Sequence, residues 1–407
     1  MTRYIGLLGV VVILGIAYAL STDRKAIKLR VVAWGLGLQL ALALFILKVP
    51  FGHMIFEKLG AGVTKLLDFT QVGASFVFGN LITNTNTFGF IFAFQVLPAI
   101  VFVGSLMSIA YYLGIMQFVV SLIAKLMVLT MGTSGAESLS AAGSVFVGQS
   151  EAPLLIRPYI ADMTKSELMA IMTGGMATIA GSVMAAYIGM LGSEWAPHLL
   201  AASIMGAPAG LVMAKIMVPE TEAPKTAGMV KLDVERTESS VIEAAAKGAA
   251  DGMHLAFVVG AMLLAFISII AMINAGLGLI HIGATQLSLE QILGWIFRPL
   301  AIVMGVPMAD ATTVGSLLGQ KIVLNEFVAY SHLSDLIKLH QISPRATMMA
   351  TFALCGFANF SSIAINIGCI GGIAPSRRGE LAQLGLRAMT AGALATCLTA
   401  TIAGLLS

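Results

Sequence analysis

The sequence contains few charged residues. Asp, Glu, Lys and Arg make up 11% of the 407 residues, whereas hydrophobic residues make up 58%. Soluble domains carry roughly 25% charged residues, so this composition excludes an ordinary soluble protein and predicts an all-α, polytopic membrane protein. The net charge is only +3 and the basic residues lie in short loops. We therefore expect lipid, and no nucleic acid, as a partner.

Residue patterns for catalysis or metal binding are also missing. The three cysteines, Cys355, Cys369 and Cys397, lie in apolar segments without a C-x-x-C pair. The six histidines are scattered without an H-E-x-x-H spacing, and no Ser/His/Asp arrangement is visible. We therefore expect no enzyme activity and no cofactor.

Long apolar runs predict about eight transmembrane helices. Their ranges are 4–20, 31–48, 89–113, 166–190, 197–218, 252–280, 346–373 and 381–405. Residues 51–78 mix charged and apolar side chains at helical spacing, which is typical of a helix lying along the membrane interface. Residues 289–305 form a second amphipathic helix.

Two further stretches, 133–163 and 309–340, each hold two short apolar arms around a polar centre. Such segments are too polar to face lipid as one rod, so we predict two re-entrant hairpins. Each hairpin is followed by a helix interrupted by Gly and polar residues and then by a continuous helix. One span, 252–280, separates the two series, which predicts an inverted repeat with a binding site near the middle of the membrane.

The predicted organisation has five parts: residues 1–113 form scaffold helices and an interfacial helix, 114–218 the first repeat, 219–247 a cytoplasmic linker, 248–288 a long scaffold helix, and 289–407 the second repeat. In the first repeat the hairpin (133–163), interrupted helix (166–190) and continuous helix (197–218) occur in that order. The second repeat has the same order at 309–340, 346–373 and 381–405. Basic residues after the first span and near Arg377 fall on one predicted side, the cytoplasm, which places both termini in the periplasm.

The polar residues of the hairpins and of the interrupted helix are the candidate binding groups. Gln149 offers two donors and one acceptor to the edge of a planar ligand, and Glu326 can accept two hydroxyl protons. Asn359 and Ser362 are three residues apart and share a helical face. A carboxylate at membrane depth, such as Glu151, is a functional-site candidate because its burial is costly.

Three stretches resemble the concentrative nucleoside transporter family: Gly148-Gln149-Ser150-Glu151-Ala152-Pro153-Leu154, then Gly319-Gln320-Lys321 leading to Asn325-Glu326-Phe327-Val328-Ala329-Tyr330, then Cys355-Gly356-Phe357-Ala358-Asn359-Phe360-Ser361-Ser362. The resemblance covers essentially the whole chain. It implies a homotrimeric importer in which each protomer moves a transport domain past a scaffold.

The resemblance also implies roles for single residues. Gln149, Ser150 and Glu151 correspond to nucleobase contacts, with Val183 nearby. Glu326, Asn359 and Ser362 correspond to ribose contacts, and Phe357 lines the same pocket. A possible Na⁺ site corresponds to Ser144, Val147, Thr178 and Ile179.

Two positions depart from the family's sodium-coupled pattern. That pattern has Asn where this chain has Ser144, and Thr where it has Ser150, a change that proton-coupled relatives share. The coupling cation is therefore Na⁺ or H⁺. The sequence thus predicts a cation-coupled secondary active importer of nucleosides in a bacterial inner membrane. The alternatives are an ion channel or a transporter of another small polar solute.

Overall fold

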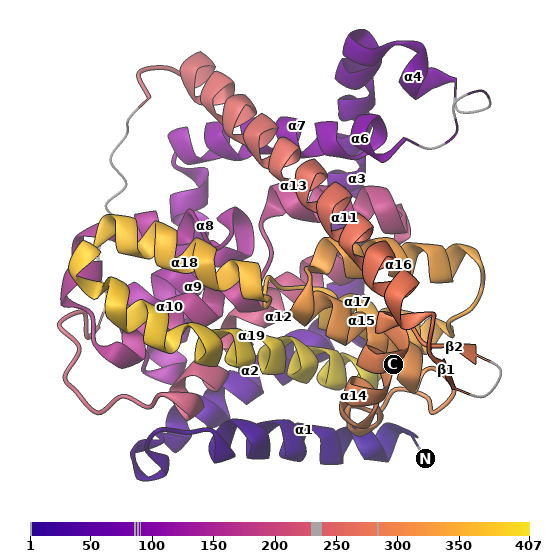
Figure 1. The fold of residues 1–407 in the computed structure, drawn as a ribbon. Coiled ribbons are helices and arrows are strands. Elements are labelled where there is room, and N and C mark those ends of the chain that lie inside the picture. The colour runs from indigo at the N-terminus through magenta and orange to yellow at the C-terminus, as the bar shows by residue number, and fades with distance from the viewer. Residues whose placement is uncertain (1, 85–86, 88, 90, 229–237, 283–284) are drawn as a thin grey trace.

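Helices make up nearly all of the described chain in the computed structural model (Figure 1). The structure describes residues 2–84, 87, 89, 91–228, 238–282 and 285–407. Within these ranges, six helices are long and apolar enough to cross a membrane, and three shorter helices are also apolar. The predicted all-α membrane fold class is confirmed.

The first part of the chain forms α1 (Thr2–Ala19), α2 (Leu29–Leu47), α3 (Pro50–Phe78), α4 (Asn80–Thr83), α6 (Phe92–Gln95), α7 (Leu97–Tyr112) and α8 (Ile115–Met131), with the short 3₁₀ helix η1 (Arg24–Ala26) between α1 and α2. Helix α3 covers the amphipathic range 51–78. Helices α6 and α7 both lie within the range 89–113, which is predicted as the third span.

The range 133–218 folds as α9 (Gly135–Val147), η2 (Ala152–Asp162), α10 (Lys165–Ala177), α11 (Gly181–Leu191), η3 (Ser193–Trp195) and α12 (Ala196–Met217). Helix α9 ends at a tip, residues 148–151, and η2 returns from it. The return arm is not a regular α-helix, because Pro158 inside it lacks the N–H that an α-helix needs and Ile156 has non-helical dihedrals. The interrupted helix is present, with its break between Ala177 and Gly181.

The later range repeats this order. It comprises α14 (Leu289–Met304), α15 (Ala311–Val323), α16 (Glu326–Lys338), α17 (Pro344–Leu354), α18 (Phe360–Ile373), η4 (Pro375–Arg377) and α19 (Arg378–Leu406). Helices α15 and α16 meet at a tip, and the chain breaks again between Leu354 and Phe360. The structure therefore contains two units, α9–α12 and α15–α19, with the same series of elements.

Between the units lies α13 (Val241–Leu277), which begins inside the range predicted for the linker. Helix α13 starts before residue 247, the predicted end of the linker, because Ser240 caps it, its side chain accepting from Glu243 N at 3.1 Å. Two short strands follow α13, β1 (His281–Ile282) and β2 (Thr285–Gln286). They pair antiparallel with His281 opposite Gln286.

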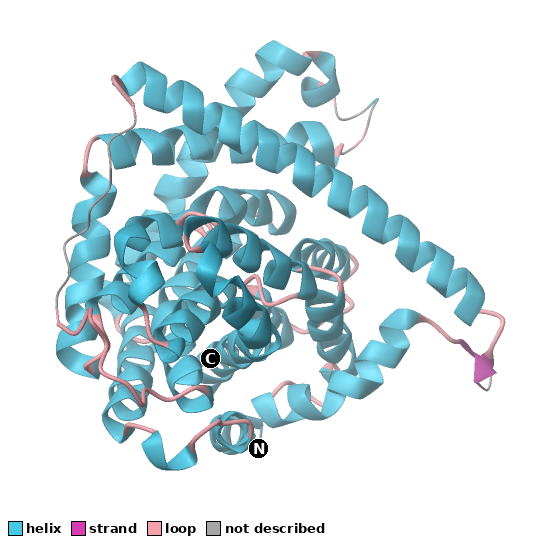
Figure 2. Ribbon diagram, turned by 60° about the vertical axis from the view of Figure 1, so that its left-hand side comes forward, coloured by secondary structure: helices cyan, strands magenta, loops and turns pink. Residues whose placement is uncertain are grey.

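The interrupted helices and their partners form the core, and α13 lies at the outside (Figure 2). In the spanning windows of Lys165–Leu191 and Ser193–Met217, 89% of residues are buried, against 17% in that of Val241–Leu277. The exposed side chains of α13 are largely apolar, including Phe257 and Leu264. Such a surface suits lipid. Helix α13 packs closely on α7, where a Cβ added at Gly104 would lie 2.9 Å from the Gly248 carbonyl oxygen.

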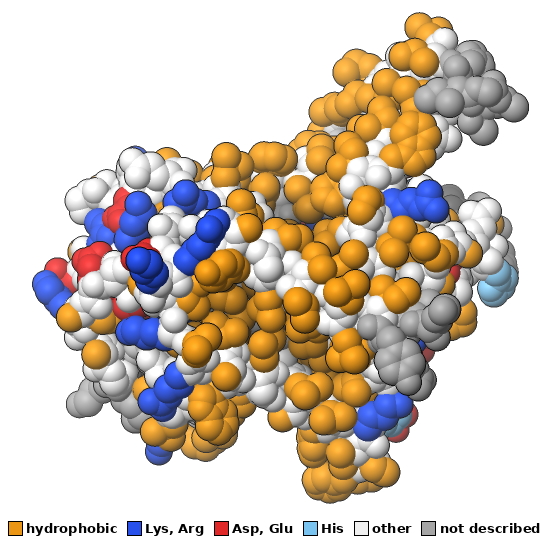
Figure 3. All heavy atoms as spheres, turned by 90° about the horizontal axis from the view of Figure 1, so that it is seen from below, with side chains coloured by type: hydrophobic (Ala, Val, Ile, Leu, Met, Phe, Trp, Pro, Cys, Tyr) orange, Lys and Arg blue, Asp and Glu red, His pale blue; other side chains and the backbone are white. Residues whose placement is uncertain are grey.

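On the face that Figure 3 shows, most of the charged side chains gather at one end, a few Lys or Arg lie toward the other, and the middle is apolar. Hydrogen bonds join the loops at this end. Arg30 donates to the Leu129 and Thr130 carbonyls at the end of α8, and Arg377 donates to the Met163 carbonyl before α10. The two predicted cytoplasmic basic clusters are thus linked to neighbouring parts of the fold.

Two capping boxes form a buried polar cluster at this end. Ser134 and Glu137 cap α9, and Thr164 and Glu167 cap α10, each side chain pairing with a backbone N–H of its partner residue. Lys215 Nζ lies 2.6 Å from Glu137 Oε2 and donates to Ser166 Oγ at 2.9 Å, so it contacts the first turns of both helices. Ser134 Oγ also donates to Glu167 Oε1 at 2.6 Å. The starts of α9 and α10 are therefore held together.

We expect Lys215→Met to lower the thermal stability of the protein. Breaking a buried ion pair typically costs about 3 kcal/mol or more because the remaining charge is left uncompensated. Lys225→Met is the matched control, since the Lys225–Asp162 pair is exposed. Thermal unfolding in detergent measures both variants. Equal midpoints for the two variants would contradict a stabilising role of the buried pair.

Candidate functional site

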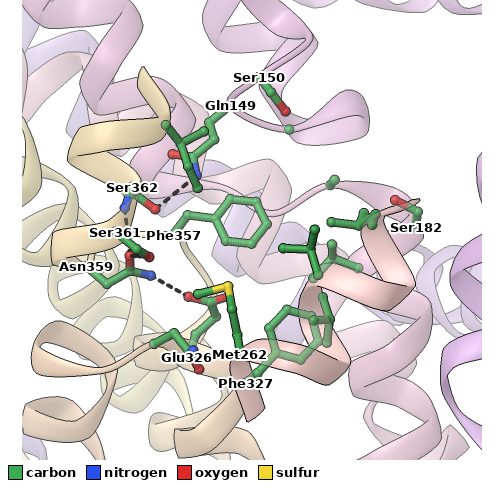
Figure 4. A pocket seen from close by; sticks show the side chains of 18 of the residues that line it. Gln149, Ser150, Ser182, Met262, Glu326, Phe327, Phe357, Asn359, Ser361 and Ser362 are labelled. Atoms are coloured by element: carbon green, nitrogen blue, oxygen red, sulfur yellow. Dashed lines mark hydrogen bonds between the residues drawn. The ribbon is translucent and has the colours of Figure 1, made fainter. Parts of the chain in front are cut away.

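A cavity of about 140 Å³ lies where the two hairpin tips and the two helix breaks meet (Figure 4). The tip before η2, the start of α16 and the start of α18 provide its polar groups, and α11 and α13 provide apolar groups. All eight predicted substrate residues line it: Gln149, Ser150, Glu151, Val183, Glu326, Phe357, Asn359 and Ser362. The structure therefore brings together residues that are up to 213 positions apart.

Breaks in the helices direct polar backbone groups at this cavity. Gly148 ends α9 with φ +83°, a left-handed conformation that glycine adopts readily. Asn325 caps α16 by accepting from Val328 N at 2.9 Å, and Asn359 caps α18 by accepting from Ser362 N at 2.9 Å. Both helix N-termini thus lie at the cavity, where their partial positive charge favours electron-rich ligand atoms.

Glu326 is the buried carboxylate of the site and is held on both oxygens. Its Oε1 accepts from the Tyr187 hydroxyl at 3.1 Å, and its Oε2 accepts from Asn359 Nδ2 at 2.7 Å. The Tyr187 ring in turn packs on Tyr330, with ring centroids 4.3 Å apart. The carboxylate has further lone pairs, so it can accept hydroxyl protons from a ligand in a fixed direction.

Gln149 is held in a second network. Its Nε2 donates to Ser362 Oγ at 2.9 Å, and its Oε1 accepts from Asn366 Nδ2 at 2.8 Å. Asn366 also donates to the Ser362 carbonyl at 2.9 Å. This network assigns the amide orientation of Gln149, so that one N–H remains for a ligand acceptor.

The remaining predicted residues occupy different depths of the cavity. Ser150 and Glu151 are exposed at the hairpin tip, whereas Val183 on α11 and Phe357 in the second break are buried. Ser150 and Glu151 therefore form the outer edge, and Val183 and Phe357 form the inner apolar wall.

Sequence reasoning missed several residues of the site. Asn366 lies four residues after Ser362 on the same helical face, and this spacing could have revealed it. Tyr187 gave no such signal because it lies in an apolar helix among other core residues. The α13 wall was also missed. It consists of Leu255, Val258, Val259 and Met262.

Two of the residues predicted to bind a cation, Ser144 and Thr178, are in contact with each other. The Thr178 hydroxyl lies 3.0 Å from the Ser144 carbonyl oxygen, and Ser144 Oγ donates to the Ser140 carbonyl at 2.8 Å. Val147 is the last residue of α9, and Ile179 lies in the break, where its carbonyl accepts from Ser203 Oγ at 3.4 Å. The cluster contains hydroxyl and carbonyl oxygens at the ends of two helices, which fits a hard cation such as Na⁺.

Three family models match the chain. The Na⁺ dependent nucleoside transporter N-terminus matches residues 8–81, nucleoside recognition matches 93–194, and the Na⁺ dependent nucleoside transporter C-terminus matches 198–404. Together they span the α1–α3 helices, the first unit and the second unit.

Individual proteins agree with the family models. An uncharacterized transporter of Haemophilus influenzae is 47% identical over 98% of this chain and 96% of its own length. Sodium/nucleoside cotransporter 1 of Rattus norvegicus is 44% identical over 98% of this chain and 63% of its own length. The structure of CNTnw in an inward-facing substrate-bound state matches with a TM-score of 0.94 and 46% identity, covering 100% of this chain and 99% of that one.

A variant of CNTnw in an outward-facing state matches equally well, with a TM-score of 0.94 and 45% identity over 100% of this chain and 98% of that one. The fold and its central cavity are those of a multi-pass membrane transporter. The chain belongs to the concentrative nucleoside transporter family. Since members of this family are transporters, the prediction that the protein is not an enzyme is confirmed.

We expect Tyr187→Phe to weaken uridine binding about tenfold, because a hydrogen bond to a charged group contributes roughly 1.5–3 kcal/mol and Glu326 would lose one donor. Isothermal titration of purified protein measures the change. Tyr330→Phe is the matched control, since this buried hydroxyl donates to the Thr351 carbonyl and not to Glu326.

The loss in Tyr187→Phe should shrink for 2′,3′-dideoxyuridine, which lacks the hydroxyls that Glu326 would accept. Equal losses for both ligands, or in both variants, would show that Tyr187 has only a packing role.

Proposed function

We propose that this protein is a cation-coupled secondary active importer of nucleosides. The observation that supports this proposal is that two hairpin tips and two helix breaks meet at one cavity. Gln149, with Ser150 and Glu151 at the edge, would read the nucleobase beside Val183. Glu326, Asn359 and Ser362 would bind the ribose hydroxyls, and Phe357 would pack against the ligand.

The same arrangement supports an elevator-type alternating-access mechanism. The polar contacts come from the two units α9–α12 and α15–α19, which would move together as a transport domain past a scaffold that includes α13. We further propose a homotrimer in a bacterial inner membrane, with both termini in the periplasm. The basic residues gathered at one end of the fold support this orientation, because cytoplasmic loops are enriched in Lys and Arg.

The coupling cation is proposed to bind at Ser144, Val147, Thr178 and Ile179 if it is Na⁺. The family models describe Na⁺ dependent transporters, and the hydroxyl and carbonyl oxygens of Ser144 and Thr178 suit this ion. A proton carried by a buried carboxylate such as Glu326 is the other route. In either case the cation must bind the substrate-loaded state more tightly than the empty state. A cation with equal affinity for both states would not change their populations.

Uptake of labelled uridine into liposomes tests the function and the coupling together. We expect saturable accumulation driven by an inward Na⁺ gradient at equal pH, or by an inward proton gradient without Na⁺. The driving gradient identifies the ion. Ion current without uridine accumulation would instead indicate a channel, and accumulation that ignores both gradients would refute cation coupling.

We expect Glu326→Gln to abolish measurable uridine uptake. The amide replaces one acceptor by a donor that would face Asn359 Nδ2 or the ribose hydroxyls, and several hydrogen bonds to a charged group are lost at about 1.5–3 kcal/mol each. Glu290→Gln is the matched control, because Glu290 also accepts from an asparagine, Asn274, but lies outside the cavity. Normal uptake by Glu326→Gln would remove this residue from the site.

A further inference from the structure

Lys321 is a fully buried lysine that the binding site described above does not use. It lies near the end of α15, just before the second hairpin tip, and its relative exposure is 1%. Its Nζ donates to the Ala353 carbonyl at 2.8 Å and to Thr396 Oγ1 at 2.8 Å. Burying an ammonium costs free energy unless its partners compensate the charge. The partners of Lys321 therefore show how its charge is stabilised.

The partners of Lys321 lie at the end of an interrupted helix. Ala353 belongs to the last turn of α17, whose carbonyls lack helical partners and carry a partial negative charge. Thr396 comes from α19, the continuous helix of the same unit. The ammonium therefore compensates the C-terminal end of α17 at the break.

The first unit has the same arrangement around its candidate cation residues. Ser144 lies near the end of α9, just before the first hairpin tip, and Thr178 lies at the end of α10. A hydroxyl of the continuous helix α12, Ser203 Oγ, reaches the Val145 and Ile179 carbonyls at 3.4 Å. In both units, then, a hairpin arm, the end of an interrupted helix and a hydroxyl of the continuous helix meet at one point.

The two meeting points differ in charge. The first unit brings hydroxyl and carbonyl oxygens, whereas the second brings its own ammonium. The second break also lies against the end of α10, because a Cβ added at Gly356 would lie 2.8 Å from the Met176 carbonyl oxygen. Lys321 and Glu326 lie on the two arms of the same hairpin, α15 and α16.

We propose that the Lys321 ammonium is a covalently attached cation, which orders the hairpin tip of the second unit just as the exchangeable coupling cation orders the tip of the first unit. It compensates the end of α17 and fixes the hairpin tip that carries Glu326. This inference rests on the proposed function. It implies that the second tip is ordered permanently, while the first is ordered only when a cation binds.

Three substitutions of Lys321 test the proposal. Lys321→Arg keeps the charge, Lys321→Met keeps the length without the charge, and Lys321→Ser leaves a space lined by oxygens. Uridine binding to purified, monodisperse protein is titrated at several NaCl concentrations, with choline chloride keeping the ionic strength constant. The Na⁺-dependent rise in thermal midpoint is recorded in parallel as a readout independent of transport.

We expect Lys321→Arg to bind uridine within about threefold of the wild-type affinity and Lys321→Met to bind at least about tenfold more weakly at every Na⁺ concentration. Lys321→Ser should be equally weak at low Na⁺ but recover affinity as Na⁺ rises, because Na⁺ can enter among the Ala353, Thr396 and serine oxygens. Its thermal midpoint should gain a Na⁺ dependence beyond that of the wild type. Lys215→Met, which also loses a buried ammonium, should retain wild-type uridine affinity.

Two results would overturn the proposal: wild-type affinity in Lys321→Met, or equal weakness of the Ser and Met variants at all Na⁺ concentrations, which indicates a packing role alone. If Lys321→Met does not fold, the Ser and Arg variants decide by the same Na⁺ response. Failure of the proposed function has a different signature, since wild-type protein would then neither bind nor accumulate uridine under any gradient.

Discussion

The structure depends on the need to satisfy backbone polar groups inside an apolar environment. Lipid offers no hydrogen bonds, so non-helical backbone at membrane depth is tolerated only where protein or a cavity surrounds it. This chain interrupts its helices at two tips and two breaks, and all four interruptions lie together at one cavity. The residues at these interruptions also carry the polar side chains that are proposed to bind a solute. The binding site is therefore a consequence of where the helices stop.

Two asparagines each have a role both in helix capping and in the cavity. Asn325 and Asn359 each cap the helix that begins at an interruption, and each also lines the cavity. Asn359 in addition donates to Glu326, so one residue starts α18 and orients the carboxylate of the second hairpin. Local helix chemistry and the geometry of the site are thus set by the same side chains, which leaves little freedom to change one without the other.

The sequence predicted the site residues best where a polar residue interrupts an apolar run. Gln149, Glu326 and Asn359 stood out because each lies among residues that otherwise suit lipid, and the structure places them around one cavity. The order of hairpin, interrupted helix and continuous helix was legible for the same reason. Periodicity could not show which distant segments are in contact. Tyr187 was therefore taken for an ordinary core aromatic, and α13 for a transmembrane helix without a role in the site. The early start of α13 depends on a single capping serine, Ser240, within a stretch whose composition resembles a loop.

The wall that α13 contributes to the cavity has a mechanical consequence. Its lining side chains, Leu255, Val258, Val259 and Met262, are all apolar, whereas the polar contacts of the cavity come from the hairpins and broken helices. A solute held by the tips would meet this wall through dispersion forces alone, which are individually weak and lack direction. Sliding past α13 would then require no hydrogen bond to break. In the proposed mechanism this wall would therefore offer little resistance to sliding, and the main barrier would come from moving the polar groups of the tips past apolar side chains.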